Sequence, residues 1–138
     1  MSSGHTITTE PTTARVQVVV AGVMLADTTR ARVLHETGLP TRYYLPRDDI
    51  DMDRLVPTDT TSTCPFKGEA VYWSAHVDGN VAADIAWSYP TPIAERADIT
   101  GLICFFNERV DQLLVDGEPL ARPETPWSSP VAPTPTSS

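Results

Sequence analysis

The chain has 138 residues, of which 41% are hydrophobic, and this is enough for one packed domain. Asp and Glu number 18 against 10 Lys and Arg, so the formal net charge is −8. This charge argues against a nucleic-acid partner, because phosphate contacts supply most of that affinity. No apolar run approaches the ~20 residues of a membrane-spanning helix, and the polar start does not resemble a secretory signal. We therefore expect a cytoplasmic protein with no membrane partner.

Both ends of the chain have compositions typical of disorder. Residues 1–13 are rich in Ser and Thr, and residues 122–138 hold five of the 13 prolines. Such segments bury too little apolar surface to offset the entropy lost on ordering. We predict disordered tails over these two ranges and a single folded domain over residues 14–121. Trp127 is the residue expected to hold the second tail against the domain.

The first half of this domain contains short β-branched or alternating apolar runs, which predict strands. Ala21 and Gly22 predict a turn, and Gly38-Leu39-Pro40 predicts a break in the chain. Residues 48–55 are consistent with one helical turn. The expected strands in this half are residues 16–20, 23–28, 29–37 and 42–45.

The second half of the domain contains signals for two hairpins. Asp78-Gly79 is a hairpin turn signal, and residues 93–97 predict a short helix after a proline break. The expected hairpins pair residues 70–77 with 81–87, and residues 101–106 with 110–115.

No segment keeps a 3.6-residue apolar period over about 12 residues, which argues against crossover helices. Short strands separated by turn signals favour an all-β architecture. We predict a mainly β single domain, either a compact antiparallel sandwich or a rolled sheet (β-tent or barrel-like), with one or two short helical turns.

The densest motif is Cys64-Pro65-Phe66-Lys67-Gly68. Nine of the ten basic residues are Arg, so Lys67 is the single lysine of the chain. A lysine retained in an Arg-rich chain suggests a role that arginine cannot fill. An ammonium near a thiol favours the thiolate, and a lysine among aromatic rings could act as an amine nucleophile. The structural alternative is a turn before a strand, with Cys64 half-buried and Lys67 solvated.

Two other groups are candidates for the same site. Trp87 and Tyr89, in a Pro-rich stretch, could form a rigid aromatic wall, or pack as an ordinary loop. Glu36, at the expected end of a strand, could act as an acid or base. It could equally pair with Arg42 or face water.

The sequence contains no convincing metal or cofactor site. Cys64 and Cys104 are too few for a thiolate zinc site, and we expect free thiols rather than a disulfide. His35 and His76 lack neighbours at metal-ligand spacing. The acidic run at residues 48–53 lacks the EF-hand pattern and is flanked by arginines, which predicts a solvated, internally paired loop. We expect no metal and no cofactor.

Five short motifs occur in a fixed order along the domain. They are Glu36-Thr37-Gly38-Leu39-Pro40, Tyr44-Leu45-Pro46 with Asp49, Cys64-Pro65-Phe66-Lys67-Gly68-Glu69-Ala70, Trp87-Ser88-Tyr89-Pro90 with Pro92, and Ile99-Thr100-Gly101 with Phe105. In this order they resemble the domain of unknown function 427 family over about residues 15–120. The resemblance implies a compact, mainly β domain and no established activity. The family also carries the label of a nucleotidyltransferase-like domain, although the chain lacks a Gly-rich phosphate loop.

These observations predict an aromatic-lined pocket that binds, or binds and transforms, a small polar or anionic metabolite. Any catalysis there would be metal-independent covalent or acid–base chemistry. The alternatives are a non-catalytic ligand-binding or protein-interaction module, and a nucleotidyltransferase-like activity. The edges of an antiparallel sheet would also allow a homodimer. The expected catalytic residues are Lys67, Cys64 and Glu36, and the expected ligand-binding residues are Tyr44, Phe66, Trp87 and Tyr89.

Overall fold

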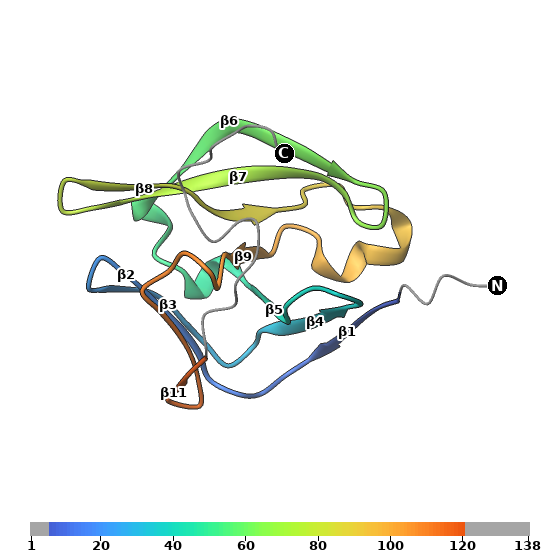
Figure 1. The fold of residues 1–138 in the computed structure, drawn as a ribbon, viewed down its shortest axis with the longest axis horizontal. Helices are drawn as coiled ribbons and strands as arrows, with labels where there is room; N and C mark the ends of the chain where they lie inside the picture. Colours follow the sequence, from blue (N-terminus) through green and yellow to red (C-terminus); the bar gives the residue numbers. More distant parts are fainter. Residues whose placement is uncertain (1–5, 121–138) are drawn as a thin grey trace.

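A computed structural model describes residues 6–120, and within them antiparallel strands form two sheets (Figure 1). The larger sheet has seven strands, in the order β1 (Ile7–Pro11), β4 (Arg32–Glu36), β5 (Arg42–Leu45), β9 (Ile103–Phe105), β8 (Asn80–Ser88), β7 (Gly68–Val77) and β6 (Leu55–Cys64). The smaller sheet has four strands, in the order β11 (Glu118–Pro119), β10 (Gln112–Val115), β2 (Val16–Val20) and β3 (Val23–Thr28). Three short 3-10 helices complete the fold: η1 (Arg47–Asp49), η2 (Met52–Arg54) and η3 (Ala94–Ile99). The predicted mainly β domain is confirmed.

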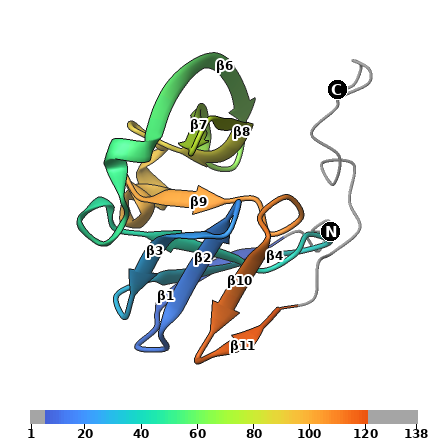
Figure 2. The same cartoon turned by 90° about the vertical axis from the view of Figure 1, so that its left-hand side faces the viewer.

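The larger sheet is curled rather than flat. Figure 1 shows β6, β7 and β8 as an upper layer, with β1 and β4 in the lower part of the molecule and β9 between the two parts. Figure 2 shows the small sheet of β2, β3, β10 and β11 below β9. The curl brings β4 and the β6–β7 turn, which are far apart in strand order, toward the same space.

Side chains that alternate along the central strands form two separate cores. Successive residues of a strand point to opposite faces of the sheet. Leu45 and Phe105 accordingly pack in a large core with Val16 and Val18 of the small sheet, whereas Tyr44 and Cys104 pack in a second cluster. This second cluster, which we call the aromatic cluster, consists of Leu34, Tyr44, Ala70, Trp87, Tyr89, Ile99, Cys104 and Phe106. The central strands are therefore buried on both faces.

Most of the predicted strands and turns are present. The hairpin of β7 and β8 turns at Asp78 and Gly79, whose φ angles of 50° and 84° are left-handed. Positive φ at both central residues matches a type I′ turn, which suits the twist of a two-residue hairpin. The predicted helical turns correspond to η1, η2 and η3.

The prediction of a disordered tail over residues 1–13 is wrong for β1. Ile7–Pro11 pairs with β4, and the Thr9 hydroxyl donates a hydrogen bond to the Asp98 carboxylate. A polar segment forms a strand here because the edge of β4 supplies its backbone partners, so no apolar pattern is needed. The predicted tail at 122–138, including Trp127, lies outside the described residues.

Two further strand predictions differ from the structure. The predicted hairpin of residues 101–106 with 110–115 is wrong, because β9 pairs with β5 and β8 while β10 pairs with β2 in the other sheet. Strand β6 was not predicted, since it is Thr-rich and mostly exposed and so has no apolar alternation. It forms an edge of the larger sheet through its pairing with β7.

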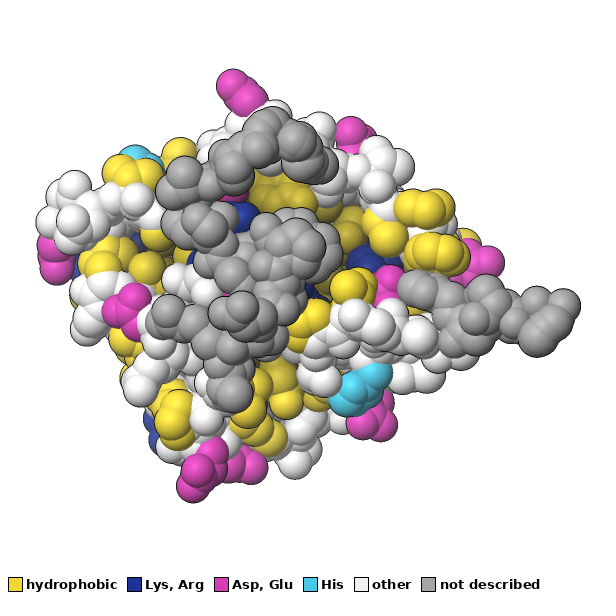
Figure 3. All heavy atoms as spheres, in the orientation of Figure 1, with side chains coloured by type: hydrophobic (Ala, Val, Ile, Leu, Met, Phe, Trp, Pro, Cys, Tyr) yellow, Lys and Arg dark blue, Asp and Glu magenta, His cyan; other side chains and the backbone are white. Residues whose placement is uncertain are grey.

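On the face seen in Figure 3, acidic side chains lie as separate groups near the outline rather than as one patch. None of the helices in residues 6–120 has the length and apolar character needed to cross a membrane.

Candidate functional site

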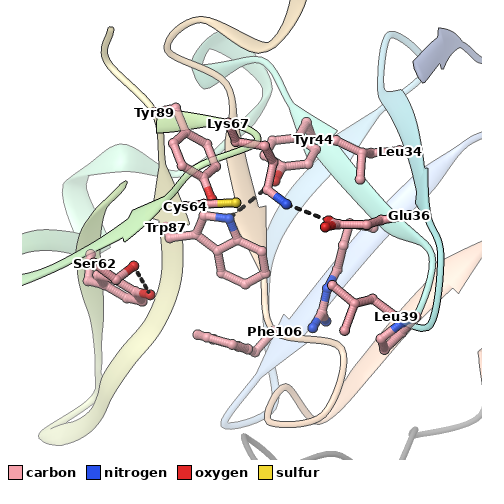
Figure 4. A pocket seen from close by; sticks show the side chains of 13 residues that line it. Leu34, Glu36, Leu39, Tyr44, Ser62, Cys64, Lys67, Trp87, Tyr89 and Phe106 are labelled. Carbon is pink, nitrogen blue, oxygen red and sulfur yellow. Dashed lines mark hydrogen bonds and ion pairs between the residues drawn. The ribbon is translucent and has the colours of Figure 1, made fainter. Parts of the chain in front are cut away.

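The aromatic cluster borders a cavity of about 280 Å³ (Figure 4). Leu34, Tyr44, Trp87, Tyr89 and Phe106 belong to both the cluster and the cavity wall. Small-molecule pockets of proteins span roughly 300–1,000 Å³, so this cavity is close to the lower end of that range. The cavity therefore has the size of a small metabolite and walls that are largely aromatic.

Six of the seven residues predicted for the site line this cavity. Glu36 ends β4, Tyr44 lies in β5, Cys64 ends β6, and Lys67 lies in the turn before β7. The remaining two, Trp87 and Tyr89, come from β8 and the residues just after it. Four segments far apart in the sequence are thus brought together by the curl of the sheet.

Phe66, which was predicted to bind the ligand, is the exception because it does not line this cavity. Its side chain is 47% exposed and borders a separate surface hollow with Ile7, Pro65 and Ile93. In the tight turn between β6 and β7, neighbouring residues point in different directions. Lys67 points inward and is buried, so Phe66 is turned outward.

The backbone of the turn fixes the direction of Lys67. The Lys67 N–H donates to the Cys64 carbonyl at 3.1 Å, and the Lys67 carbonyl accepts from the Ile93 N–H at 2.9 Å. Gly68 has a φ of 124°, and a Cβ there would lie 3.0 Å from the Pro92 Cα. Only glycine fits this close approach and this φ without strain. The Cys-Pro-Phe-Lys-Gly motif is therefore first of all a rigid turn that delivers one lysine to the cavity.

Lys67 forms a buried ion pair with Glu36. The Lys67 Nζ donates to the Glu36 Oε1 at 2.5 Å, and the two side chains are 9% and 6% exposed. An ammonium has three N–H donors. Glu36 is the one hydrogen-bond acceptor for this ammonium among residues 6–120, which leaves two N–H groups for other acceptors.

Arg42 pairs with Glu108, so the predicted alternative of an Arg42–Glu36 pair is wrong. Its two terminal nitrogens donate to the two Glu108 oxygens at 2.6 and 3.0 Å. The guanidinium also lies over Trp87, at 5.1 Å from the ring centroid, and over Phe106, at 5.8 Å. Burial is the largest single influence on the pKa of Arg42 and lowers it, but the hydrogen bonds to Glu108 and the nearby acidic groups together outweigh burial and leave that pKa above its ordinary value.

The tyrosines of the cavity differ in how their hydroxyls are used. The Tyr44 hydroxyl accepts a hydrogen bond from the Trp87 Nε1 at 3.2 Å. The Tyr89 hydroxyl has no hydrogen-bond partner in the described part of the chain, although the residue is only 5% exposed. Burial, followed by the neighbouring Cys64, raises the pKa of Tyr89 well above its ordinary value. This hydroxyl therefore stays protonated and able to donate.

The two cysteines are free and occupy different environments. Cys64 is partly buried and lines the cavity, whereas Cys104 is fully buried in the aromatic cluster. Burial raises the pKa of the Cys104 thiol to about 12. Cys104 is thus a packing residue, and Cys64 is the thiol that a ligand in the cavity could contact.

Residues 6–120 contain no group of three or more His, Cys, Asp or Glu side chains placed to hold a metal. In the acidic run, Asp49 accepts hydrogen bonds from Thr28 and Arg30, and Asp51 accepts one from Arg54. These carboxylates do not line the cavity. The predicted internal pairing is present for Asp51 with Arg54, whereas Asp49 pairs with residues of another segment.

Seven lining residues were not predicted from the sequence: Leu34, Leu39, Pro40, Arg42, Ser62, Tyr72 and Phe106. A signal for Leu34, Arg42 and Ser62 was present, because residues two apart in a strand share a face. Such pairs, each lining the cavity, are Leu34 and Glu36, Arg42 and Tyr44, Ser62 and Cys64, and Trp87 and Tyr89.

The family described as a domain of unknown function (DUF427) matches residues 8–116. The chain belongs to this family. The match includes all of β1 but Ile7, and it spans every element that contributes to the cavity. No curated protein matches the chain in sequence. The family match thus identifies the domain and assigns it no activity.

Proposed function

We propose that this domain binds a small molecule that presents a hydrogen-bond-accepting oxygen, such as a carboxylate or carbonyl oxygen, to Lys67. The observation that carries the proposal is the buried ammonium of Lys67. It is bonded to one carboxylate and keeps two donor groups at the wall of the cavity. A buried charged donor without an acceptor is costly, so a ligand oxygen at this point gains binding energy.

The Tyr89 hydroxyl adds a second donor in the same cavity. Tyr89 as a residue is buried, and its hydroxyl is protonated and has no partner among residues 6–120. Trp87, Leu34 and Phe106 supply apolar and aromatic walls. A few polar groups among mostly apolar walls are typical of small-molecule sites. The ligand that fits best is therefore a compact molecule with an oxygen acceptor at one end and a flat or apolar body.

Binding is favoured over metal-dependent nucleotidyl transfer by the chemistry of the wall. That reaction uses carboxylates to hold Mg²⁺. Among the described lining residues, Glu36 supplies the one carboxylate, and it is paired with Lys67. The donors of this wall therefore suit a ligand with an acceptor oxygen better than a metal ion.

The proposal is tested with benzoate and with benzylamine, a probe of similar size but opposite charge. Isothermal titration of the full chain should show benzoate binding and no benzylamine binding. Lys67→Met should weaken benzoate binding about tenfold or more, since a hydrogen bond to a charged group is lost. Lys67→Arg keeps the charge but changes its shape, and should give an intermediate affinity. Equal binding of both probes, no binding of benzoate, or an unchanged benzoate affinity in Lys67→Met, would overturn the proposal.

A further inference from the structure

The Cys64 thiol lies in the same cavity as the two donors. Figure 4 shows its sulfur among Tyr89, Trp87 and Lys67, with the hydroxyl end of Tyr89 turned toward it. Both residues line the cavity, so a ligand held there can contact the thiol and the hydroxyl together. Packing in the aromatic cluster explains the positions of the apolar lining residues, and the ion pair explains those of Lys67 and Glu36. They do not account for a thiol beside the Tyr89 hydroxyl, which has no acceptor among residues 6–120, and the Lys67 ammonium, which has two N–H groups left for a ligand.

Resting on the proposed function, we propose that Cys64 is a nucleophile that adds reversibly to the carbonyl carbon of a small aldehyde bound in this cavity. The aldehyde oxygen would lie between the Lys67 ammonium and the Tyr89 hydroxyl. The substrate class is an aldehyde with an apolar or aromatic body, as the walls require. Cys64 is then the catalytic residue, because it touches the reacting atom.

The step is balanced without any co-reactant. The sulfur forms a bond to the carbonyl carbon, and the electron pair of the carbon–oxygen π bond moves to oxygen. The developing oxyanion is stabilised by the N–H groups of Lys67 and the O–H of Tyr89, as in an oxyanion hole. The proton of the thiol ends on that oxygen, and the product is a hemithioacetal.

The surroundings favour addition over acyl transfer. Acyl transfer needs a group that protonates a leaving atom, a role that histidine most often fills. His35 and His76 do not line the cavity among the described residues. Aldehyde addition has no leaving group and needs only the donors that are present. The hydrogen bond of Lys67 to Glu36 also engages the ammonium as a donor, which favours attack by sulfur over imine formation.

Cys104 provides an internal control. It is a second free thiol of the same chain, fully buried in the aromatic cluster and hydrogen-bonded to the Phe105 carbonyl at 3.8 Å. It does not line the cavity. A reaction that depends on the cavity should therefore modify Cys64 and leave Cys104 unchanged.

The experiment uses benzaldehyde labelled with carbon-13 at the carbonyl, added to the full chain and followed by NMR. Wild type should show a new tetrahedral carbon signal, which Cys64→Ser abolishes. Tyr89→Phe should weaken the adduct about tenfold, because it removes one donor to the oxyanion. Benzaldehyde should also slow iodoacetamide labelling of Cys64, and peptide mapping should show Cys104 unlabelled with or without it.

The outcomes separate the two proposals. No tetrahedral signal in wild type, together with benzoate binding, would overturn the nucleophile and leave the binding function standing. A tetrahedral signal that persists in Cys64→Ser, or a trigonal imine carbon that Lys67→Met removes, would also overturn it. If benzoate does not bind either, the binding function fails as well. If Cys64→Ser does not fold, Tyr89→Phe still tests the proposal through its weaker adduct. This variant should fold, because the Tyr89 hydroxyl makes no hydrogen bond to residues 6–120 that the substitution would remove.

Discussion

Two buried ion pairs, Arg42–Glu108 and Lys67–Glu36, lie at the same cavity. They differ in how many hydrogen-bond donors remain for a ligand. Arg42 places two nitrogens on both oxygens of Glu108 and lies over two aromatic rings. Lys67 makes one hydrogen bond to Glu36 and keeps two donors beside the cavity. The first pair is a bidentate, stacked arrangement that suits the guanidinium. In the second pair, the lysine ammonium has two N–H donors that Glu36 does not occupy. We therefore assign a stabilising role to the Arg42–Glu108 pair and a ligand-binding role to the Lys67–Glu36 pair.

The largest effect should come from breaking the Arg42–Glu108 pair. Glu108→Gln leaves the buried guanidinium without its charge partner, and should cost about 3–5 kcal/mol of unfolding free energy. Urea denaturation followed by circular dichroism measures this. The control is Asp27→Asn, which breaks the exposed pair with Arg15 and should cost at most about 1 kcal/mol. Equal losses in the two variants would contradict a structural role for the buried pair.

Breaking the Lys67–Glu36 pair should have a smaller effect on stability and a larger one on binding. Lys67→Met should cost about 1–3 kcal/mol, because the cavity gives the remaining carboxylate access to water. The double variant Lys67→Met with Glu36→Met removes both charges and should recover most of that loss. Neither variant should bind benzoate as wild type does. A loss in Lys67→Met as large as in Glu108→Gln would show that the two pairs do not differ.

Alkaline pH distinguishes the unpartnered hydroxyl from the rest of the site. The folded pKa of Tyr89 is raised, whereas the unfolded pKa is near 10, so the stability linked to its proton is present below pH 10 and is lost above it. Above pH 10, wild type should lose about 1.4 kcal/mol per pH unit from this group. Tyr89→Phe lacks the group, so urea midpoints measured at pH 9–11 should fall less steeply in that variant. Parallel slopes would contradict the raised pKa.

The smallest expected effect is a difference in stability at neutral pH between Tyr44→Phe and Tyr89→Phe. Tyr44→Phe removes the acceptor for the Trp87 Nε1 and should cost about 1 kcal/mol. Tyr89→Phe removes a hydroxyl that has no partner in the described chain and should change stability by less than about 0.5 kcal/mol. Thermal melts of the two variants, paired with benzoate titrations, make the comparison. Tyr89→Phe should bind benzoate more weakly than wild type despite its unchanged stability.

Local patterns predicted the strands whose side chains alternate or are β-branched, such as β2, β5 and β8. They did not predict β1 and β6, which are polar edge strands held by the backbone of a neighbour. The prediction of a hairpin between residues 101–106 and 110–115 was wrong for a related reason. Two strands with strong local signals can be adjacent in sequence and still belong to different sheets, because pairing is set by long-range contacts.

For the site, the sequence by itself determined which residues are chemically unusual: the single lysine, the Cys-Pro-Phe-Lys-Gly turn and the aromatic pair at Trp87 and Tyr89. It left open whether Glu36 pairs with Arg42, and it placed Phe66 in the pocket. Only the curl of the larger sheet decided these points, because it sets Glu36 against Lys67 and turns Phe66 outward. A side chain's type is fixed by the sequence, but its partner depends on which distant strand lies across the cavity.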